Sequence, residues 1–226
     1  AAAGLFNDTF NIDPRGSNDS LRVMRFENKA FIRLQPWSED GVLSKLDVGI
    51  GDRLLSYYNP ERGFVRKGSN EVWNSLYVYA GVQGFLPAGI SWDASGDYVF
   101  LGKEFSDMTL AANAKMVSYP FRRAKKSPVT IAAHFKTSLD EPEFYSQHLF
   151  SNHYSWDNSF SKISTTRITG EVDIPYWKMR AEAGYALLAN NIYYDSLGVI
   201  RQNGTPMSVL SASLTKNFKV GAFHFD

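Results

Sequence analysis

The chain has 226 residues, of which 44% are hydrophobic and 15% are aromatic, and this aromatic content excludes a disordered chain. A formal net charge of +1 gives no electrostatic basis for binding nucleic acid. The absence of Cys excludes a disulfide scaffold and thiol chemistry, and no apolar run reaches the ~18 residues of a transmembrane helix.

Turn-forming dipeptides dominate residues 1–25, so we predict a loop or lead-in segment there. Residues 26–226 instead alternate between apolar and polar side chains, the period-two pattern of β-strands with two different faces. We predict β-hairpins throughout this region, with the chain ending in the middle of a further strand that starts at Phe223. The predicted strands are 26–34, 43–58, 72–85, 92–100, 108–116, 129–139, 156–174, 179–194 and 207–218.

Strand and connection lengths indicate a membrane barrel. Most of the predicted strands have roughly 9 to 16 residues, near or above the ~9–11 that a tilted strand needs to cross a bilayer. Short turns near residues 36, 86, 122, 175 and 219 mostly alternate with longer loops near 59, 140 and 195, as in outer-membrane barrels, although the loop near 102 is short for its rim. We predict an all-β, antiparallel up-and-down transmembrane β-barrel, with about nine to ten strands in this chain.

The clearest alternation covers residues 179–194, and its end carries Tyr193 and Tyr194, an aromatic collar suited to a membrane interface. We expect the apolar parity to face lipid, because a basic residue on the lipid face near the midplane costs about 2–4 kcal/mol. The residues expected to face lipid are Ala181, Ala183, Tyr185 and Leu187, and those expected to face the lumen are Arg180, Glu182 and Gly184.

Ionisable residues of both signs recur on the polar parity of neighbouring predicted strands. In a barrel they would face water and influence the passage of ions and solutes. The alternative is a ladder of cross-strand salt bridges that only stabilises the wall. The predicted pore-lining residues are Asp47, Asp93, Asp97, Lys115, His134, Lys136, Arg167, Glu171, Asp173, Arg180 and Glu182.

Signatures of catalysis and of cofactor binding are missing from the sequence. Neither a Ser-His-Asp pattern nor a Gly-rich phosphate loop is present, because residues 47–52 form a strand with two small residues. His148 and His153 share a predicted loop with acidic residues, but a separation of five positions is not a metal-ligand spacing. We therefore predict no enzyme activity, no cofactor and no metal site, and we interpret the basic turn at 122–128 as a solvated rim.

Several blocks of sequence carry a resemblance to a known family. These blocks are FIRLQPW (31–37), KLDVGIGD (45–52), NSLYVYAG (74–81), YPFRR (119–123), KISTT (162–166), IPYWK (174–178) and ANNIYYD (189–195). In them the chain resembles the putative porin family of Bacteroidetes outer membranes. The resemblance implies a longer single-chain barrel of which this chain is an internal portion, a pore, and a place in the bacterial outer membrane. It offers no catalytic residues.

Three functions follow as hypotheses. The first is a porin for passive diffusion of small polar solutes or ions, with outer-membrane lipid and these solutes as its partners. The second is a non-conducting envelope barrel that acts as a scaffold or as the subunit of an envelope protein, with Tyr77, Tyr79 and Gln83 helping to fill the lumen. The third is a soluble β-sandwich or barrel that binds a ligand, although Ala and Gly share the apolar face where a core would favour large aliphatic residues.

Overall fold

One large antiparallel sheet of nine strands dominates the computed structural model, which describes residues 9–35, 38, 40–60, 68–121, 127–220 and 223–225. The strand order is β1-β2-β3-β4-β5-β6-β9-β10-β13, so strands adjacent in the sheet follow one another along the chain apart from short hairpins. This confirms the predicted all-β, up-and-down antiparallel architecture. The strands of this sheet are β1 (Arg22–Leu34), β2 (Lys45–Pro60), β3 (Gly68–Leu86), β4 (Ile90–Gly102), β5 (Met108–Ser118), β6 (Val129–Asp140), β9 (Ile163–Ile174), β10 (Met179–Ala189) and β13 (Met207–Lys216).

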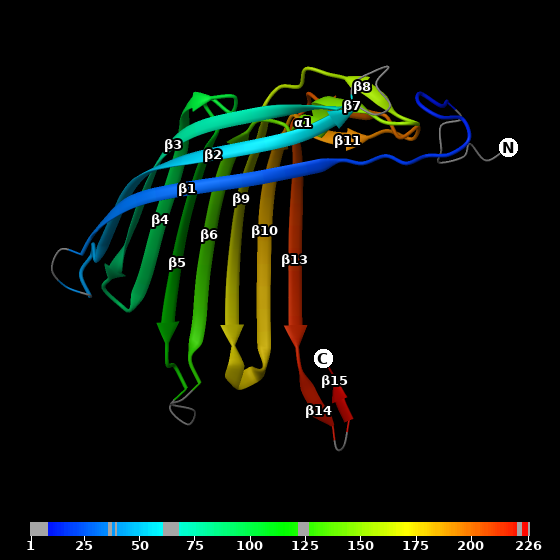
Figure 1. The fold of residues 1–226 in the computed structure, drawn as a ribbon. Helices are drawn as coiled ribbons and strands as arrows, with labels where there is room; N and C mark the ends of the chain where they lie inside the picture. The colour runs from blue at the N-terminus through cyan, green and yellow to red at the C-terminus, as the bar shows by residue number, and fades with distance from the viewer. Residues whose placement is uncertain are drawn as a thin grey trace.

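The large sheet is strongly curved, with β1, β2 and β3 folded across one end of the other strands (Figure 1). Its two edges, β1 and β13, do not pair with each other, so the sheet is not closed within the described residues. No helix in this part of the chain is long and apolar enough to cross a membrane.

The two longest connections, from β6 to β9 and from β10 to β13, lie at the same end of the strands, called here the upper rim. The upper rim carries α1 (Phe144–Gln147), β7 (His148–Phe150) and β8 (Ser155–Asp157) (Figure 1). The opposite, short-turn end carries the turn after β3, where Ala88 and Gly89 both have positive φ, and the 3-10 turn η1 (Pro175–Trp177) before β10, together with the connections from β1 to β2 and from β5 to β6. The turns predicted at 36–41 and 122–128 lie partly outside the described residues.

The prediction of one continuous strand over residues 179–194 is wrong. β10 ends at Ala189, and Asn190 adopts φ 57°, a left-handed conformation that Asn tolerates better than most residues. The chain then leaves the large sheet as β11 (Asn191–Tyr194) and pairs with β12 (Ile200–Asn203), inside the predicted loop at 195–204. Tyr193 and Tyr194 therefore belong to a rim hairpin rather than to the wall.

Three other boundaries also differ from the sequence-based expectation. Residues 156–174 are not one strand, because β8 pairs with β7 while the backbone of Asn158 donates to Gln147 O at 2.7 Å. The predicted loop at 140–153 contains α1 and β7. The last alternation forms β14 (Phe218–Val220) and β15 (Phe223–Phe225), a separate hairpin and not a tenth strand of the large sheet.

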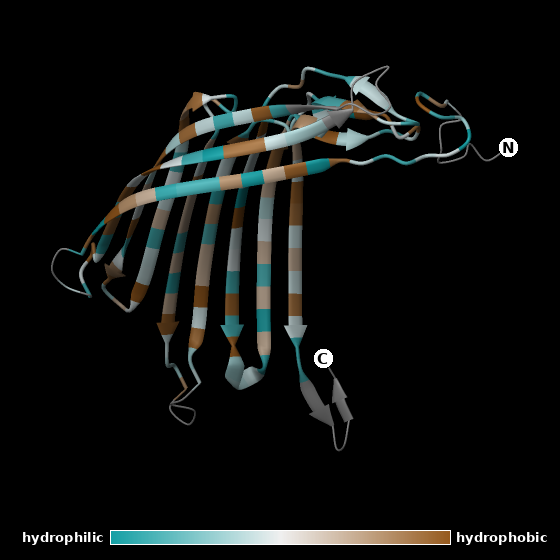
Figure 2. Cartoon of the chain, viewed as in Figure 1, coloured by the Kyte–Doolittle hydropathy of each residue, from teal (hydrophilic) through white to brown (hydrophobic). Residues whose placement is uncertain are grey.

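The strand register separates the side chains into two faces. Residues directly paired across an antiparallel sheet point to the same side, so each parity forms a continuous surface across all nine strands. Figure 2 shows hydrophobic and hydrophilic residues alternating along these strands. The apolar face is uncovered in the described structure, where Leu210, Ile32 and Leu214 are 82%, 70% and 69% exposed.

Packing of buried hydrophobic residues occurs mainly on the other face. Leu55, Tyr57 and Trp73 on β2 and β3 form a buried cluster with Phe144 of α1, and all three strand residues belong to the polar parity. Figure 1 places α1 on the inner side of the curve. The polar parity is therefore the concave face of the sheet, and the apolar parity is the convex face.

Candidate functional site

The concave face is the candidate functional surface, because it gathers most of the ionisable residues of the large sheet. Asp52 is an exception, since its pairing with Asn28 and Leu76 places it on the convex face. The register places all eleven predicted pore-lining residues on the concave face, from Asp47 on β2 to Arg180 and Glu182 on β10. Their assignment to the lining of a pore stays a prediction.

Some of these residues form cross-strand pairs. Arg33 donates from Nε and Nη2 to the two carboxylate oxygens of Asp47 at 2.8 and 2.9 Å. Arg180 Nη2 lies 2.9 Å from Glu171 Oε2. Exposed ion pairs of this kind contribute about 0–1 kcal/mol each, so the ladder stabilises the wall only modestly and leaves its charges in contact with solvent.

A neutral side chain links two further members of the predicted set. Asn113 Nδ2 donates to Asp93 Oδ2 at 2.7 Å, and Asn113 Oδ1 lies 2.8 Å from His134 Nδ1. With its amide directed to Asp93, Asn113 offers only its carbonyl oxygen to the ring, so Nδ1 carries the hydrogen. Asn113 belongs to the same parity as its two partners and was not among the predicted residues.

Aromatic side chains lie flat along the concave face between β1 and β3. Tyr77 crosses over Gly51 and donates from its hydroxyl to Glu27 Oε1 at 2.8 Å. A Cβ added at Gly51 would lie 2.1 Å from Tyr77 Cζ, so only glycine leaves room for the ring. Lys29 Nζ lies 3.0 Å from the centroid of the Tyr79 ring, a cation–π contact. These tyrosines point inward, as expected, and lie against the wall.

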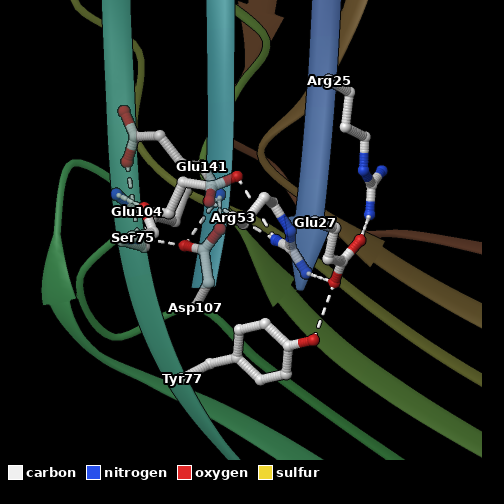
Figure 3. A network of polar contacts seen from close by, with 9 residues as sticks. Arg25, Glu27, Arg53, Ser75, Tyr77, Glu104, Asp107 and Glu141 are labelled. Atoms are coloured by element: carbon white, nitrogen blue, oxygen red, sulfur yellow. Dashed lines mark hydrogen bonds and ion pairs between the residues drawn. The ribbon is translucent and has the colours of Figure 1, made fainter. Parts of the chain in front are cut away.

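Near the upper rim, an arginine joins the wall to the turn between β4 and β5 (Figure 3). Arg53 Nη1 lies 3.4 Å from Glu104 Oε2, and Arg53 Nη2 lies 3.6 Å from Glu27 Oε1. Glu27 also accepts from Arg25 at 2.6 Å, and the Glu104 backbone donates to Ser75 Oγ at 3.3 Å. Acidic and basic side chains alternate through this network, so each carboxylate, including that of the buried Glu104, has a positively charged partner.

A second set of contacts fixes the segment that follows β6. Asp107 accepts the backbone N–H of Glu141 at 2.9 and 3.0 Å and forms an ion pair with Lys162. Lys162 Nζ also lies 3.4 Å from Glu141 Oε2. Burial raises the pKa of Asp107, an effect that the hydrogen bonds from Lys162 and Glu141 oppose. The turn before β5 thus holds both ends of the long connection from β6 to β9.

The connection from β6 to β9 packs on the concave face of the β2–β3 hairpin. The Phe144 ring stacks on Tyr57 at a centroid distance of 5.1 Å and meets Trp73 edge-on at 6.1 Å. The Tyr145 hydroxyl lies 2.6 Å from Tyr58 O and 2.9 Å from Arg22 O. We refer to residues 141–158 as the inner segment, since its packing places it inside the curve of the sheet.

Asn152 joins the inner segment to the residues before β1. It is fully buried, its Oδ1 accepts the backbone N–H groups of Ile12 and Asp13 at 3.0 Å, and its Nδ2 donates to Asp13 O and Gly16 O. The residues before β1, predicted only as a loop, therefore form part of the upper rim.

The two loop histidines do not converge on a metal site. His148 Nδ1 lies 2.6 Å from Asp157 Oδ1, whereas His153 Nε2 lies 2.6 Å from Ser17 Oγ. Within the described ranges, no group of three or more His, Asp or Glu side chains is arranged to hold a metal ion.

A depression of about 250 Å³ opens on the concave face toward the short-turn end. Its polar lining includes Lys45 and Gln83, which are directly paired on β2 and β3, together with Asp47, Asp93 and the Tyr79 ring. Lys45 was absent from the predicted set although its parity could have identified it. Glu104 and Asp107 were also missed, because an irregular turn carries no period-two signal. Lys162 was missed because the predicted strand 156–174 placed it on the parity opposite to Arg167, whereas β9 begins only at Ile163.

An all-β protein with one large curved sheet, polar on its concave face and apolar on its convex face, has the architecture from which porin walls are built. The chain belongs to the family described as "Putative porin", whose model matches residues 2–226. The comparison with curated proteins and the comparison with solved structures each found no match.

Proposed function

We propose that this chain forms part of the wall of an outer-membrane β-barrel porin, through which small polar solutes or ions diffuse passively. The observation that carries the proposal is the contrast between the two faces. Leu210, Leu214 and Ile32 are exposed on the convex face, and the concave face carries most of the charged residues of the large sheet and the buried cluster. In a soluble β-sandwich the apolar face would be the packed core, so we assign this face to lipid acyl chains.

Closure of the sheet into a barrel is part of the same proposal. β1 and β13 are long edge strands, and in the described structure each pairs with a neighbour on one side only. An open edge inside a bilayer leaves backbone N–H and C=O groups without hydrogen bonds, at a cost of several kcal/mol for each group. Closing the sheet would satisfy both edges and enclose the eleven predicted pore-lining residues in an aqueous lumen. Membership in a porin family supports this role and a protein without enzyme activity.

Cysteine labelling tests the assignment of the faces. Ser213 pairs with Glu182 on the concave face, while its neighbour Ala212 pairs with Ala183 on the convex face. In the membrane-inserted protein, a water-soluble thiol reagent should label Ser213→Cys, and Ala212→Cys should react only with a lipid-soluble reagent. The reverse result would show that the convex face lines the lumen and the concave face contacts lipid. Equal labelling of both variants by the water-soluble reagent would contradict contact of either face with lipid.

Electrical recording tests passage. The full-length protein in planar bilayers should produce discrete conductance steps, and its folded form should stay with membranes after a carbonate wash and migrate differently on gels after heating. A protein that stays with membranes after the carbonate wash and shows the heat-dependent gel shift, but produces no conductance steps, would contradict the porin function.

A non-conducting envelope barrel is the second candidate, and the inner segment favours it. Phe144 and Tyr145 occupy space inside the curve of the sheet, where Tyr77 and Tyr79 also lie. Such a barrel would serve as a scaffold or as the subunit of an envelope protein. Co-purification of a stoichiometric envelope protein, together with silent bilayers, would support this function over passive diffusion.

A further inference from the structure

Two cations face each other across neighbouring strands in the wall. Lys136 on β6 is directly paired with Arg167 on β9, and both are exposed on the concave face. Directly opposite side chains in an antiparallel sheet have Cβ atoms about 4.5–5.5 Å apart, and like charges at this separation are destabilising. A pair of this kind needs a negatively charged group nearby to offset the repulsion.

The surrounding wall supplies no such group. We take the row that contains Lys136 and Arg167, the rows directly above and below it, and the flanking strands β5 and β10. None of these positions carries a carboxylate. They are Thr109, Ala111 and Asn113 on β5, Ser138, Lys136 and His134 on β6, Thr165, Arg167 and Thr169 on β9, and Leu188, Ala186 and Gly184 on β10.

Arg167 differs in this respect from the other arginines of the large sheet that the structure describes. Arg25, Arg33, Arg53 and Arg180 lie within ion-pair distance of carboxylates, and Arg22 lies over the Tyr58 ring.

The other like-charged pair on the wall is relieved by a neighbour. Glu171 and Glu182 are directly paired across β9 and β10, and Arg180 Nη2 lies 2.9 Å from Glu171 Oε2. No acidic residue does the same for Lys136 and Arg167 in the part of the chain that the structure describes. The charge of this pair is therefore available to a ligand.

We propose that Lys136 and Arg167 form a binding site for an oxyanion, the phosphate or carboxylate group of a small anionic solute. A guanidinium binds two oxygens of such a group in a fork, and an ammonium beside it adds a point charge. In the next row Thr165 is directly paired with Ser138, which is buried, and the small side chains of Ala111 and Ala186 flank the pair. The site depends on the proposed function in one respect only: the concave face must be accessible to water.

Binding of inorganic phosphate to the folded, detergent-solubilised full-length protein tests the site without requiring conductance. Titration calorimetry at low ionic strength should detect phosphate. Lys136→Gln or Arg167→Gln should weaken binding about three- to fivefold each, and the double variant by about tenfold or more, the range of exposed ion pairs. Raising the ionic strength should weaken binding by the wild type. Arg201→Gln is the matched control, because it removes the same charge from the β11–β12 hairpin, outside the large sheet.

The outcomes separate the site from the porin function. Phosphate binding that is weakened in Arg167→Gln and unchanged in Arg201→Gln supports the site, even if the protein produces no conductance in bilayers. Equal weakening in both variants would show a general charge effect and overturn it. Conductance without detectable phosphate binding would also overturn the site while leaving the porin function in place. Variants that keep the heat-dependent gel shift of the folded barrel exclude misfolding as the cause.

Discussion

Replacing Phe144 with Ala should release the inner segment from the wall. The Phe144 side chain is 6% exposed and contacts the rings of Tyr57, Trp73, Tyr145 and His148 at centroid distances of 5.1 to 6.1 Å. Truncating a buried Phe to Ala costs about 3–5 kcal/mol. We take about 3 kcal/mol, because the cluster lies at a rim, and this corresponds to an increase of roughly 100-fold in the population of the opened segment.

Hydrogen exchange of the amides in residues 141–150 measures this opening directly. Protection there should fall by about two orders of magnitude in Phe144→Ala, and exchange in the middle of β9 and β10 should not change. Phe105→Ala is the matched control, since Phe105 lies on the turn between β4 and β5 at the same rim and is 56% exposed. If Phe144→Ala leaves the protection unchanged, or if Phe105→Ala reduces it equally, the aromatic cluster does not hold the segment. A larger single-channel conductance in Phe144→Ala would show in addition that the segment narrows the lumen.

Two further predictions address the wall and the rim. Gly51→Ala should displace the Tyr77 ring, since the new Cβ would lie 2.1 Å from Tyr77 Cζ. Overpacking of this kind should lower the free energy of unfolding in urea by about 1–3 kcal/mol. In the Tyr77→Ala background Gly51→Ala should lose most of this effect, and additive effects of the two substitutions would contradict a steric clash between them. Asp195 accepts hydrogen bonds from Arg201 and from the backbone N–H groups of Val199 and Leu197, and these hydrogen bonds lower its pKa below the ordinary 3.8. The ionised carboxylate of Asp195 therefore stabilises the β11–β12 hairpin fully above pH 3.8, and this stabilisation is lost as the pH falls through the lowered pKa and the carboxylate is protonated. Protection of the Leu197 amide, relative to its intrinsic exchange rate, should follow that loss in the wild type and show no acid dependence in Asp195→Asn.

The sequence by itself determined the class of the fold and the two faces of the wall. Both follow from side-chain alternation, which is a local property: successive residues of a strand point to opposite sides, and directly paired residues of neighbouring strands point to the same side. Residues as distant along the chain as Asp47 and Glu182 could therefore be assigned to one face before any pairing was known. The register places both on the concave face.

Only the tertiary structure decided what happens at the upper rim, where no periodic signal exists. Tyr145 reaches Tyr58 across 87 positions of the chain, and Asn152 reaches Asp13 across 139. Contacts at such separations depend on which strands the sheet has already brought together. The end of β10 was also not predicted: the sequence indicated a strand through Tyr194, whereas β10 ends at Ala189 because Asn190, with φ 57°, turns the backbone out of the large sheet.

The register also decided which charges meet. The sequence predicted Lys136 and Arg167 as members of one polar set, but their direct opposition depends on the relative shift of β6 and β9. The chain between these strands forms the inner segment, so its length does not determine that shift. A shift of two residues would keep both on the concave face and separate them. Face assignment needs only the parity of each strand, whereas a binding site needs the exact pairing of strands that are distant in sequence.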